Sequence, residues 1–196
     1  MYFSTNDLKV ISIGEGFRLQ PIDCGLILDD ASQEILMKLG QSDRIKKYLP
    51  NLDFSSKDAI EKFIMGLSLK TETGLEFAYS IKVGNLILGM IFVNTPTLNE
   101  QMIGLEKWTV DFFILEPFEG KHYMKAALIR MMHFMKTSIH VDDFLMLVDQ
   151  DNDKCLKLIE SLPMDELDNR GFHNPEGNKF PPRVFHCPLS QLRFAE

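Results

Sequence analysis

The chain has 196 residues, of which 45% are hydrophobic and 25% are charged. This composition is typical of one globular domain and excludes an intrinsically disordered chain. Its 28 acidic and 21 basic side chains give a formal net charge of -7, which disfavours nucleic acid or an anionic membrane surface as the main partner.

The cysteines and the N-terminal residues indicate the cellular compartment. Cys24, Cys155 and Cys187 form no C-x-x-C pair, so the sequence indicates neither a disulfide framework nor a zinc ribbon. The histidines share no metal-ligand spacing, and we expect no metal site. The first residues do not resemble a signal peptide, and no run reaches the roughly 18 apolar residues of a membrane-spanning helix. We therefore expect a cytoplasmic protein, a monomer or a homodimer, that binds no membrane.

The first half of the chain is predicted to hold a strand, two helices with a short turn between them, and a β-hairpin. A loose leader covers residues 1–12, and an exposed loop is expected over 94–104. Ser55-Ser56-Lys57-Asp58 resembles a capping box, and Gly84-Asn85 is a two-residue hairpin connection. The strand is expected over 17–22, the helices over about 30–39 and from 57 to 73–74, the short turn over 43–48, and the hairpin strands over 77–83 and 86–92.

The centre of the chain, residues 107–136, is predicted to form a strand, a tight loop and a helix. The strand is apolar on both faces except at Thr109 and Asp111, as expected for the middle of an α/β sheet. After Gly120, a helical stripe is expected to be buried; it consists of Met124, Leu128, Met131 and Met135. Because the first N–H groups of a helix have no internal partners, this arrangement favours an anion site.

The last part of the chain is predicted to add strands and one more helix. Residues 144–148 form an apolar run typical of a buried parallel strand, and a helix capped within Asp149–Asn152 follows it and ends by Pro163. A strand is expected near 167–172 and a closing strand at 183–187. The order of elements predicts an α/β fold, a single mixed central sheet with helices on both faces.

The segments FEGKHYMKAAL and DQDNDKCLKLIESL resemble the acyl-CoA-binding half of the GNAT superfamily of N-acetyltransferases, particularly the ribosomal-protein N-terminal acetyltransferases. FRLQPI is similar to the first strand of that branch, and the resemblance covers about residues 15–190. It implies one GNAT-like domain over residues 1–196, with acetyl-CoA as the acyl donor. The implied acceptor is a primary amine, on a peptide N-terminus or a small molecule, and no nucleic acid or metal takes part.

The family's loop pattern, Gln/Arg-x-x-Gly-x-Gly/Ala, falls on residues 117–122, where Gly120 is the matching residue. Its later Asn-x-x-Ser pattern falls on Asn152–Cys155, with cysteine in place of serine. The resemblance implies that coenzyme A is bound by backbone and side chains of Phe113, Ile114, Leu115, Phe118, Glu119, Gly120, Lys121, His122, Tyr123, Lys125, Asn152 and Cys155.

Four residues are candidates for catalysis. Asp111, a carboxylate among apolar neighbours, is the first candidate for the base or amine ligand; the alternative is that it pairs with an Arg or Lys. Glu106 is the second candidate base. Many family members use a tyrosine of the last helix as the acid, and here Cys155 or Ser161 would replace it. The alternative function is a catalytically inactive domain of the same fold that binds acyl-CoA or a protein partner.

Overall fold

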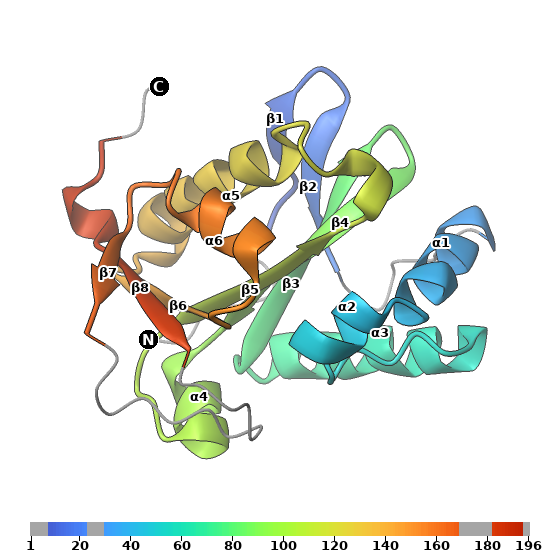
Figure 1. The fold of residues 1–196 in the computed structure, drawn as a ribbon, viewed down its shortest axis with the longest axis horizontal. Coiled ribbons are helices and arrows are strands. Elements are labelled where there is room, and N and C mark those ends of the chain that lie inside the picture. The colour runs from blue at the N-terminus through green and yellow to red at the C-terminus, as the bar shows by residue number, and fades with distance from the viewer. Residues whose placement is uncertain (1–7, 23–29, 169–181, 194–196) are drawn as a thin grey trace.

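The computed structural model describes residues 8–22, 30–168 and 182–193. The described strands form one eight-stranded mixed sheet in the order β1-β2-β3-β4-β5-β6-β8-β7 (Figure 1). The strands are β1 (Ile11–Gly14), β2 (Phe17–Pro21), β3 (Glu76–Val83), β4 (Leu86–Asn94), β5 (Thr109–Ile114), β6 (Phe144–Val148), β7 (Asp165–Leu167) and β8 (Arg183–Cys187). The predicted mixed sheet is thus confirmed.

Helices cover both faces of the sheet, as predicted (Figure 1). One face is covered by α1 (Asp30–Gly40), α2 (Asp43–Tyr48) and α3 (Lys57–Glu72), and the other by α5 (Tyr123–Phe134) and α6 (Asp153–Ile159). The remaining helical segments are α4 (Pro96–Ile103), the single turns η2 (Glu116–Phe118) and η4 (Leu189–Gln191), and η3 (Met135–Ile139), a π turn that extends α5.

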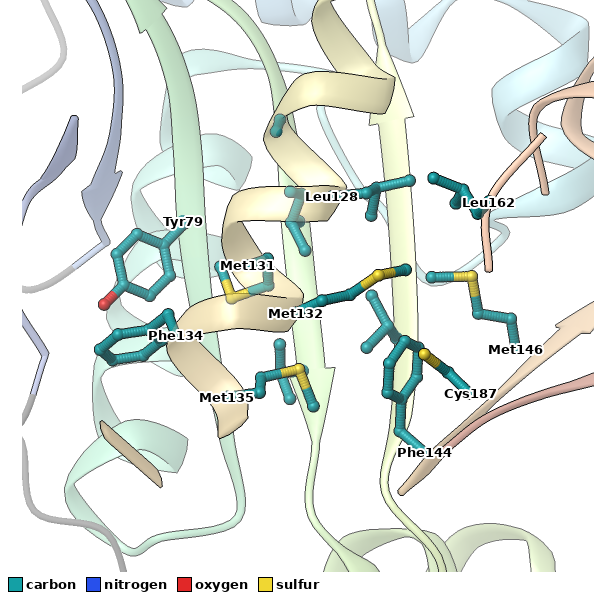
Figure 2. Close-up of a cluster of buried hydrophobic side chains, with 14 of the residues drawn as sticks. Tyr79, Leu128, Met131, Met132, Phe134, Met135, Phe144, Met146, Leu162 and Cys187 are labelled. Carbon is teal, nitrogen blue, oxygen red and sulfur yellow. The ribbon is translucent and has the colours of Figure 1, made fainter. Parts of the chain in front are cut away.

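The larger hydrophobic core lies between the sheet and α5 (Figure 2). The four residues of the predicted stripe on α5 and η3 are all at most 4% exposed, which confirms the stripe. Burying a methionine or leucine side chain contributes about 1.5–3 kcal/mol, so this stripe holds α5 firmly on the sheet. The N-terminus of α5 is therefore a fixed feature of the molecule.

The local signals in the first half of the chain produce the predicted elements. The Ser56 hydroxyl accepts a hydrogen bond from the Ala59 N–H at 3.1 Å and so caps α3. Gly84 adopts φ +58° in the turn between β3 and β4, a left-handed conformation that favours glycine. The hairpin and α1–α3 therefore follow from the sequence.

Two expectations for the chain are wrong. Residues 94–104 are not a loop, because Thr95 caps α4 through a 3.4 Å hydrogen bond from the Leu98 N–H, and Gly104 ends the helix at φ +67°. Residues 11 and 12 are not part of a loose leader, because they lie in β1 and pair with β2. Of the strand expected near 167–172, only Leu167 lies in β7; residues 169–172 are outside the described residues.

The two central strands separate along their length. β4 pairs with β5 from Gly89–Ile114 to Asn94–Thr109, and β6 pairs with β8 from Phe144 to Val148. In contrast, β5 and β6 are parallel and share the single pair Thr109–Leu145, next to a 2.9 Å hydrogen bond from the Leu145 N–H to the Trp108 carbonyl. Beyond that point the strands diverge and leave a gap in the sheet.

Candidate active site

A cavity of about 830 Å³ occupies the gap between β5 and β6. Its walls come from both faces of the sheet: α5 and α6 on one side and α2 on the other. Phe112 and Ile114 contact the core beneath α5, while Phe113 belongs to the core beneath α1–α3. Side chains of β5 therefore alternate between the two faces, and Asp111 lies on the face of α2.

The backbone of β5 offers amides to this gap. The Leu115 N–H donates to the Leu88 carbonyl of β4 at 2.8 Å, whereas the Trp108 carbonyl faces β6. Because backbone groups alternate along a strand, the amides of Val110, Phe112 and Ile114 all point toward β6. Val110 follows the paired residue Thr109 and faces Leu145, so the amides of Phe112 and Ile114 are the ones that open onto the gap. Among the predicted contacts, Ile114 is placed to donate into the cavity, while the amides of Phe113 and Leu115 face β4. The sequence prediction missed Phe112.

The loop before α5 lines part of the cavity. Gly120 has φ +69°, and His122, the N-cap residue of α5, has φ +61°. An added Cβ at Gly120 would meet no atom within 4 Å, so glycine is required here for the backbone conformation and not for lack of space. Gly120, His122, Tyr123 and Lys125 line the cavity. The first amides of α5 therefore open onto it, as an anion site requires.

Glu119 is held by two cations. Arg44 of α2 forms an ion pair with its carboxylate, and Lys154 of α6 donates to it at 2.6 Å. Burial alone would raise the pKa of Glu119, but the hydrogen bonds from Arg44 and Lys154 outweigh burial and leave the pKa below its ordinary value. The repulsion between this carboxylate and a bound phosphate is thereby reduced.

Aromatic contacts fix the rest of the loop. The Phe118 and Tyr123 rings meet edge to face at 6.5 Å between centroids, and Tyr123 meets Phe17 at 5.3 Å. The Lys121 ammonium lies 5.6 Å from the centroid of the Phe118 ring. Phe118 lines the cavity, whereas the predicted contact Lys121 does not. The side chain of Lys121 therefore stabilises the loop by a cation–π contact.

Asp111 lines the cavity and belongs to a polar network. The Asn94 amide donates to the Asp111 carboxylate at 2.8 Å and to the Thr109 hydroxyl at 3.2 Å. The Asn99 amide of α4 donates to the same hydroxyl at 3.1 Å. Glu106, the second candidate base, is exposed in the segment before β5 and lines neither cavity described here. The geometry thus favours Asp111 as the candidate base.

Cys155 and Asn152 also line the cavity, at the start of α6. The Asn152 side chain accepts a hydrogen bond from the Cys155 N–H at 3.3 Å, so its role in the structure is to cap α6. Burial, together with the charge of Asp111, raises the pKa of the Cys155 thiol to about 12. Cys155 is therefore a neutral thiol at pH 7. The Ser161 hydroxyl donates to the Leu158 carbonyl at 2.6 Å.

The sequence prediction missed the contribution of α2. Arg44 and Tyr48, one helical turn apart, both line the cavity. The Tyr48 hydroxyl donates to the Asp151 carboxylate at 3.1 Å, just before α6, and Lys47 pairs with the same carboxylate. α2 is thus tied across the gap to the wall formed by α6. No local motif marks these residues, because their partners are distant in the chain.

Within residues 8–22, 30–168 and 182–193, no group of three or more His, Cys, Asp or Glu side chains is arranged to hold a metal ion. None of the described helices has the length and hydropathy needed to span a membrane.

Comparisons with known proteins agree with this geometry. A family model described as an acetyltransferase (GNAT) domain matches residues 27–165. The structure resembles RimL, a ribosomal L7/L12 alpha-N-protein acetyltransferase in complex with coenzyme A, with a TM-score of 0.73 and 15% identity over 93% of this chain and 99% of that one. A comparison with curated protein sequences finds no match.

Two further solved structures are similar. One is an acetyltransferase from Salmonella typhimurium that modifies the N-terminal serine of ribosomal protein L7/L12, with a TM-score of 0.69 and 15% identity over 91% of this chain and 96% of that one. The other is RimJ from Mycobacterium smegmatis in complex with a coenzyme A disulfide, with a TM-score of 0.71 and 11% identity over 91% and 85%.

The fold, the cavity and the family match support an acetyltransferase over the inactive alternative, with acetyl-CoA as the acyl donor. The expected GNAT-like fold is confirmed, and the chain belongs to the GNAT family of acetyltransferases.

Proposed function

We propose that the chain transfers the acetyl group of acetyl-CoA to the α-amino group of a peptide or protein N-terminus. The observation that carries this proposal is the cavity between β5 and β6. It joins the N-terminus of α5 on one face of the sheet to Asp111 and α2 on the other. Such a cavity suits a reaction in which an anionic donor and an amine acceptor enter from opposite faces.

On the donor side, the amides at the start of α5 would bind the pyrophosphate of coenzyme A, with Lys125 adding positive charge. A helix N-terminus contributes about 0.3–1 kcal/mol for each favourable contact with an anion. The amides of Phe112 and Ile114 face the gap and would bind the pantetheine arm and polarise the thioester carbonyl. These amides can bind a ligand only where β5 is not paired with β6. The two strands share a single residue pair and then diverge, so this condition is met.

On the acceptor side, Asp111 would accept a proton from the ammonium group, directly or through a water molecule. The neutral amine then attacks the carbonyl carbon and a C–N bond forms. The nitrogen releases its second proton to solvent, the C–S bond breaks, and the thiolate leaves. An α-amino group has a pKa of about 7.7–8.0, so a weak base suffices, whereas a lysine side chain at about 10.4 requires a stronger one. A single carboxylate therefore favours an N-terminal acceptor.

The leaving thiolate takes a proton at the end of the reaction. Cys155 can donate a hydrogen bond to it, but full transfer from a thiol with a pKa of about 12 to a thiolate of ordinary basicity is uphill by roughly 4–5 kcal/mol. We therefore assign Cys155 a hydrogen-bonding role and expect solvent to supply the proton. The structural relatives support the choice of acceptor, since two are described as acting on ribosomal proteins at their N-termini.

The first test measures thiol release from acetyl-CoA in the presence of a peptide with a free N-terminus. We expect Asp111→Asn to lower kcat by about 100-fold or more, because the base is lost, and to leave the affinity for acetyl-CoA nearly unchanged. Asp142→Asn is the matched control, since Asp142 is exposed and does not line the cavity. Full activity of Asp111→Asn would place the base elsewhere.

A second arm uses the same peptide with a blocked N-terminus and one lysine. Acetylation of that peptide at the same rate would contradict the α-amino acceptor. Binding of acetyl-CoA without turnover on any amine would favour the inactive binding domain, for which Pro117, Glu119 and His122 are the motivating departures from the loop pattern.

We place this reaction in the cytoplasm, because the described cysteines, Cys155 and Cys187, are free thiols, as is usual in a reducing compartment. We expect a single domain that acts as a monomer or a homodimer without nucleic acid or a membrane. Size-exclusion chromatography with light scattering would decide between the two oligomeric states.

A further inference from the structure

A second cavity, of about 550 Å³, lies beside the first. It is bounded by α1, the start of β4 and the segment Leu115–Phe118, and it shares Arg44, Phe118 and Lys154 with the first cavity. Leu115 and Leu39, which line it, belong to the core beneath α1–α3. The second cavity therefore opens on the face of the sheet from which the acceptor is proposed to enter.

The lining of this cavity combines an apolar floor with positive charge. Ile35, Leu39 and Leu86 provide apolar surface, and Leu86 is itself 39% exposed. Lys38, Arg44 and Lys154 converge from α1, α2 and α6, whereas Glu116 is the acidic residue among the described lining residues. A cavity of this kind suits a ligand with an apolar body and a negative charge.

Lys38 is the cation that carries this inference. Arg44 and Lys154 are both engaged by Glu119, but Lys38 has no ion-pair partner within the described part of the chain. It stands beside the cavity in a protein whose net charge is -7. Lys38 is therefore available to pair with an anionic group of a ligand that packs on the exposed Leu86.

We propose that the second cavity is an acceptor subsite that takes an acidic side chain of the peptide whose N-terminus is acetylated. The inference rests on the proposed function and specifies its substrate class. An extended peptide advances about 3.3–3.6 Å per residue, so a side chain a few residues after the N-terminus reaches a neighbouring cavity. The methylene groups of Glu would pack on Leu39 and Leu86, and its carboxylate would pair with Lys38.

The test uses peptides that are identical except for a single Glu or Gln at position 2, 3, 4 or 5. With the unmodified enzyme, we expect Glu at one or two of these positions to lower KM about three- to five-fold relative to Gln, with kcat unchanged, as is typical of one exposed charge pair. Lys38→Gln should remove this preference. Lys38→Glu should reverse it in favour of a peptide with Lys at the same position.

Lys46→Gln is the matched control and should retain the preference for Glu. Lys46 lies on α2, is exposed, lines neither cavity and has no ion pair among the described residues. Melting temperatures show whether all variants are folded. If Lys38→Glu does not fold, Lys38→Gln still tests the inference.

Two results would overturn the inference: equal KM values for the Glu and Gln peptides at every position, or a preference for Glu that survives both changes at Lys38. Failure of the proposed function is distinguishable from either, because in that case acetyl-CoA binds but no peptide of the series is acetylated.

Discussion

The residue that departs most visibly from the family's loop pattern is His122. It stands where the pattern has Gly or Ala, and its backbone has φ +61°, in the left-handed region that costs an ordinary residue about 1–2 kcal/mol. Histidine tolerates this region better than most residues, which explains why the loop still forms. A left-handed conformation is therefore kept with some strain at a position where the pattern has a small residue.

We expect His122→Gly to raise the free energy of unfolding by about 0.5–1 kcal/mol, less than the full strain because glycine is also more flexible when unfolded. Urea denaturation measures this change, and His122→Val should be destabilising. His140→Gly is the matched comparison, since His140 has φ +60° and should give a gain in unfolding free energy of similar size. A loss of stability in His122→Gly would contradict the strain argument.

At Glu119 the prediction concerns pH. The ion pairs of Glu119 lower its pKa in the folded protein below the ordinary value. They therefore stabilise the folded protein fully above the pKa of the unfolded chain, about 4.3. This stabilisation is lost as the pH falls through the pKa of the folded protein. We expect Glu119→Gln to be less stable than the unmodified protein at pH 7 and the difference to shrink below about pH 4. Unfolding free energies measured across this range test it; a difference independent of pH would contradict it.

At the scale of the element, α4 is the helix whose position links the sheet to the site. It is only eight residues long, so it depends on its ends. The Thr95 hydroxyl caps it and also donates to the Leu75 carbonyl at 2.8 Å. Its Asn99 contacts Thr109, two residues before Asp111 in β5.

We expect Thr95→Ala to lower the free energy of unfolding by about 1–2 kcal/mol, since both hydrogen bonds of the hydroxyl are lost. Thr95→Ser keeps the hydroxyl and should restore most of that stability. Chemical denaturation of the two variants provides the comparison, and equal losses in both would show that the methyl group, not the cap, is what matters.

The strands β5 and β6 are the elements that create the site. Each is fully paired on its outer side, β5 with β4 and β6 with β8, so their divergence leaves neither strand without support. The sheet therefore lacks a few hydrogen bonds between β5 and β6, but each strand is still held by its outer neighbour. This is why backbone amides can be exposed to a ligand in the centre of the molecule.

At the scale of the whole molecule, binding of acetyl-CoA should stabilise the protein, because the cavity draws on α2, α5, α6 and both central strands. A ligand at about 100 times its Kd contributes roughly 2.7 kcal/mol, which for a protein of this size corresponds to a rise in Tm of about 5–10 °C. Differential scanning fluorimetry measures this shift.

Gly120→Val is the matching variant for that experiment. A β-branched residue at φ +69° distorts the loop, so we expect the acetyl-CoA shift to disappear. An unchanged shift would place the phosphates away from Gly120. The absence of any shift in the unmodified protein, even at millimolar acetyl-CoA, would contradict the donor site as a whole.

Elements whose signals lie within a few residues were predictable. The hairpin turn at Gly84-Asn85, the helix starts expected at residues 55–58 and 149–152 and the stripe on α5 each involve neighbours in the chain, and each is present in the structure. The structure selects Ser56 and Asn152 as the capping residues. α4 was missed although Thr95, Pro96 and Gly104 are ordinary start and stop signals, because its apolar residues are too few to outline a stripe.

The amino-acid sequence thus determined most of the elements, their order and the glycine-containing loop before α5, since these depend on local propensity and spacing. The resemblance of its segments to the GNAT family was also visible in the sequence. Only the tertiary structure decided that β5 and β6 part after Thr109–Leu145, that the amides of Phe112 and Ile114 face the gap, and that Arg44 and Lys154 neutralise Glu119. The physical reason is the same in each case: strand pairing and ion pairs join residues distant in the chain, and packing selects which of them meet. The loop before α5 consists of consecutive residues, whereas the cavity is lined by residues that are far apart in the chain.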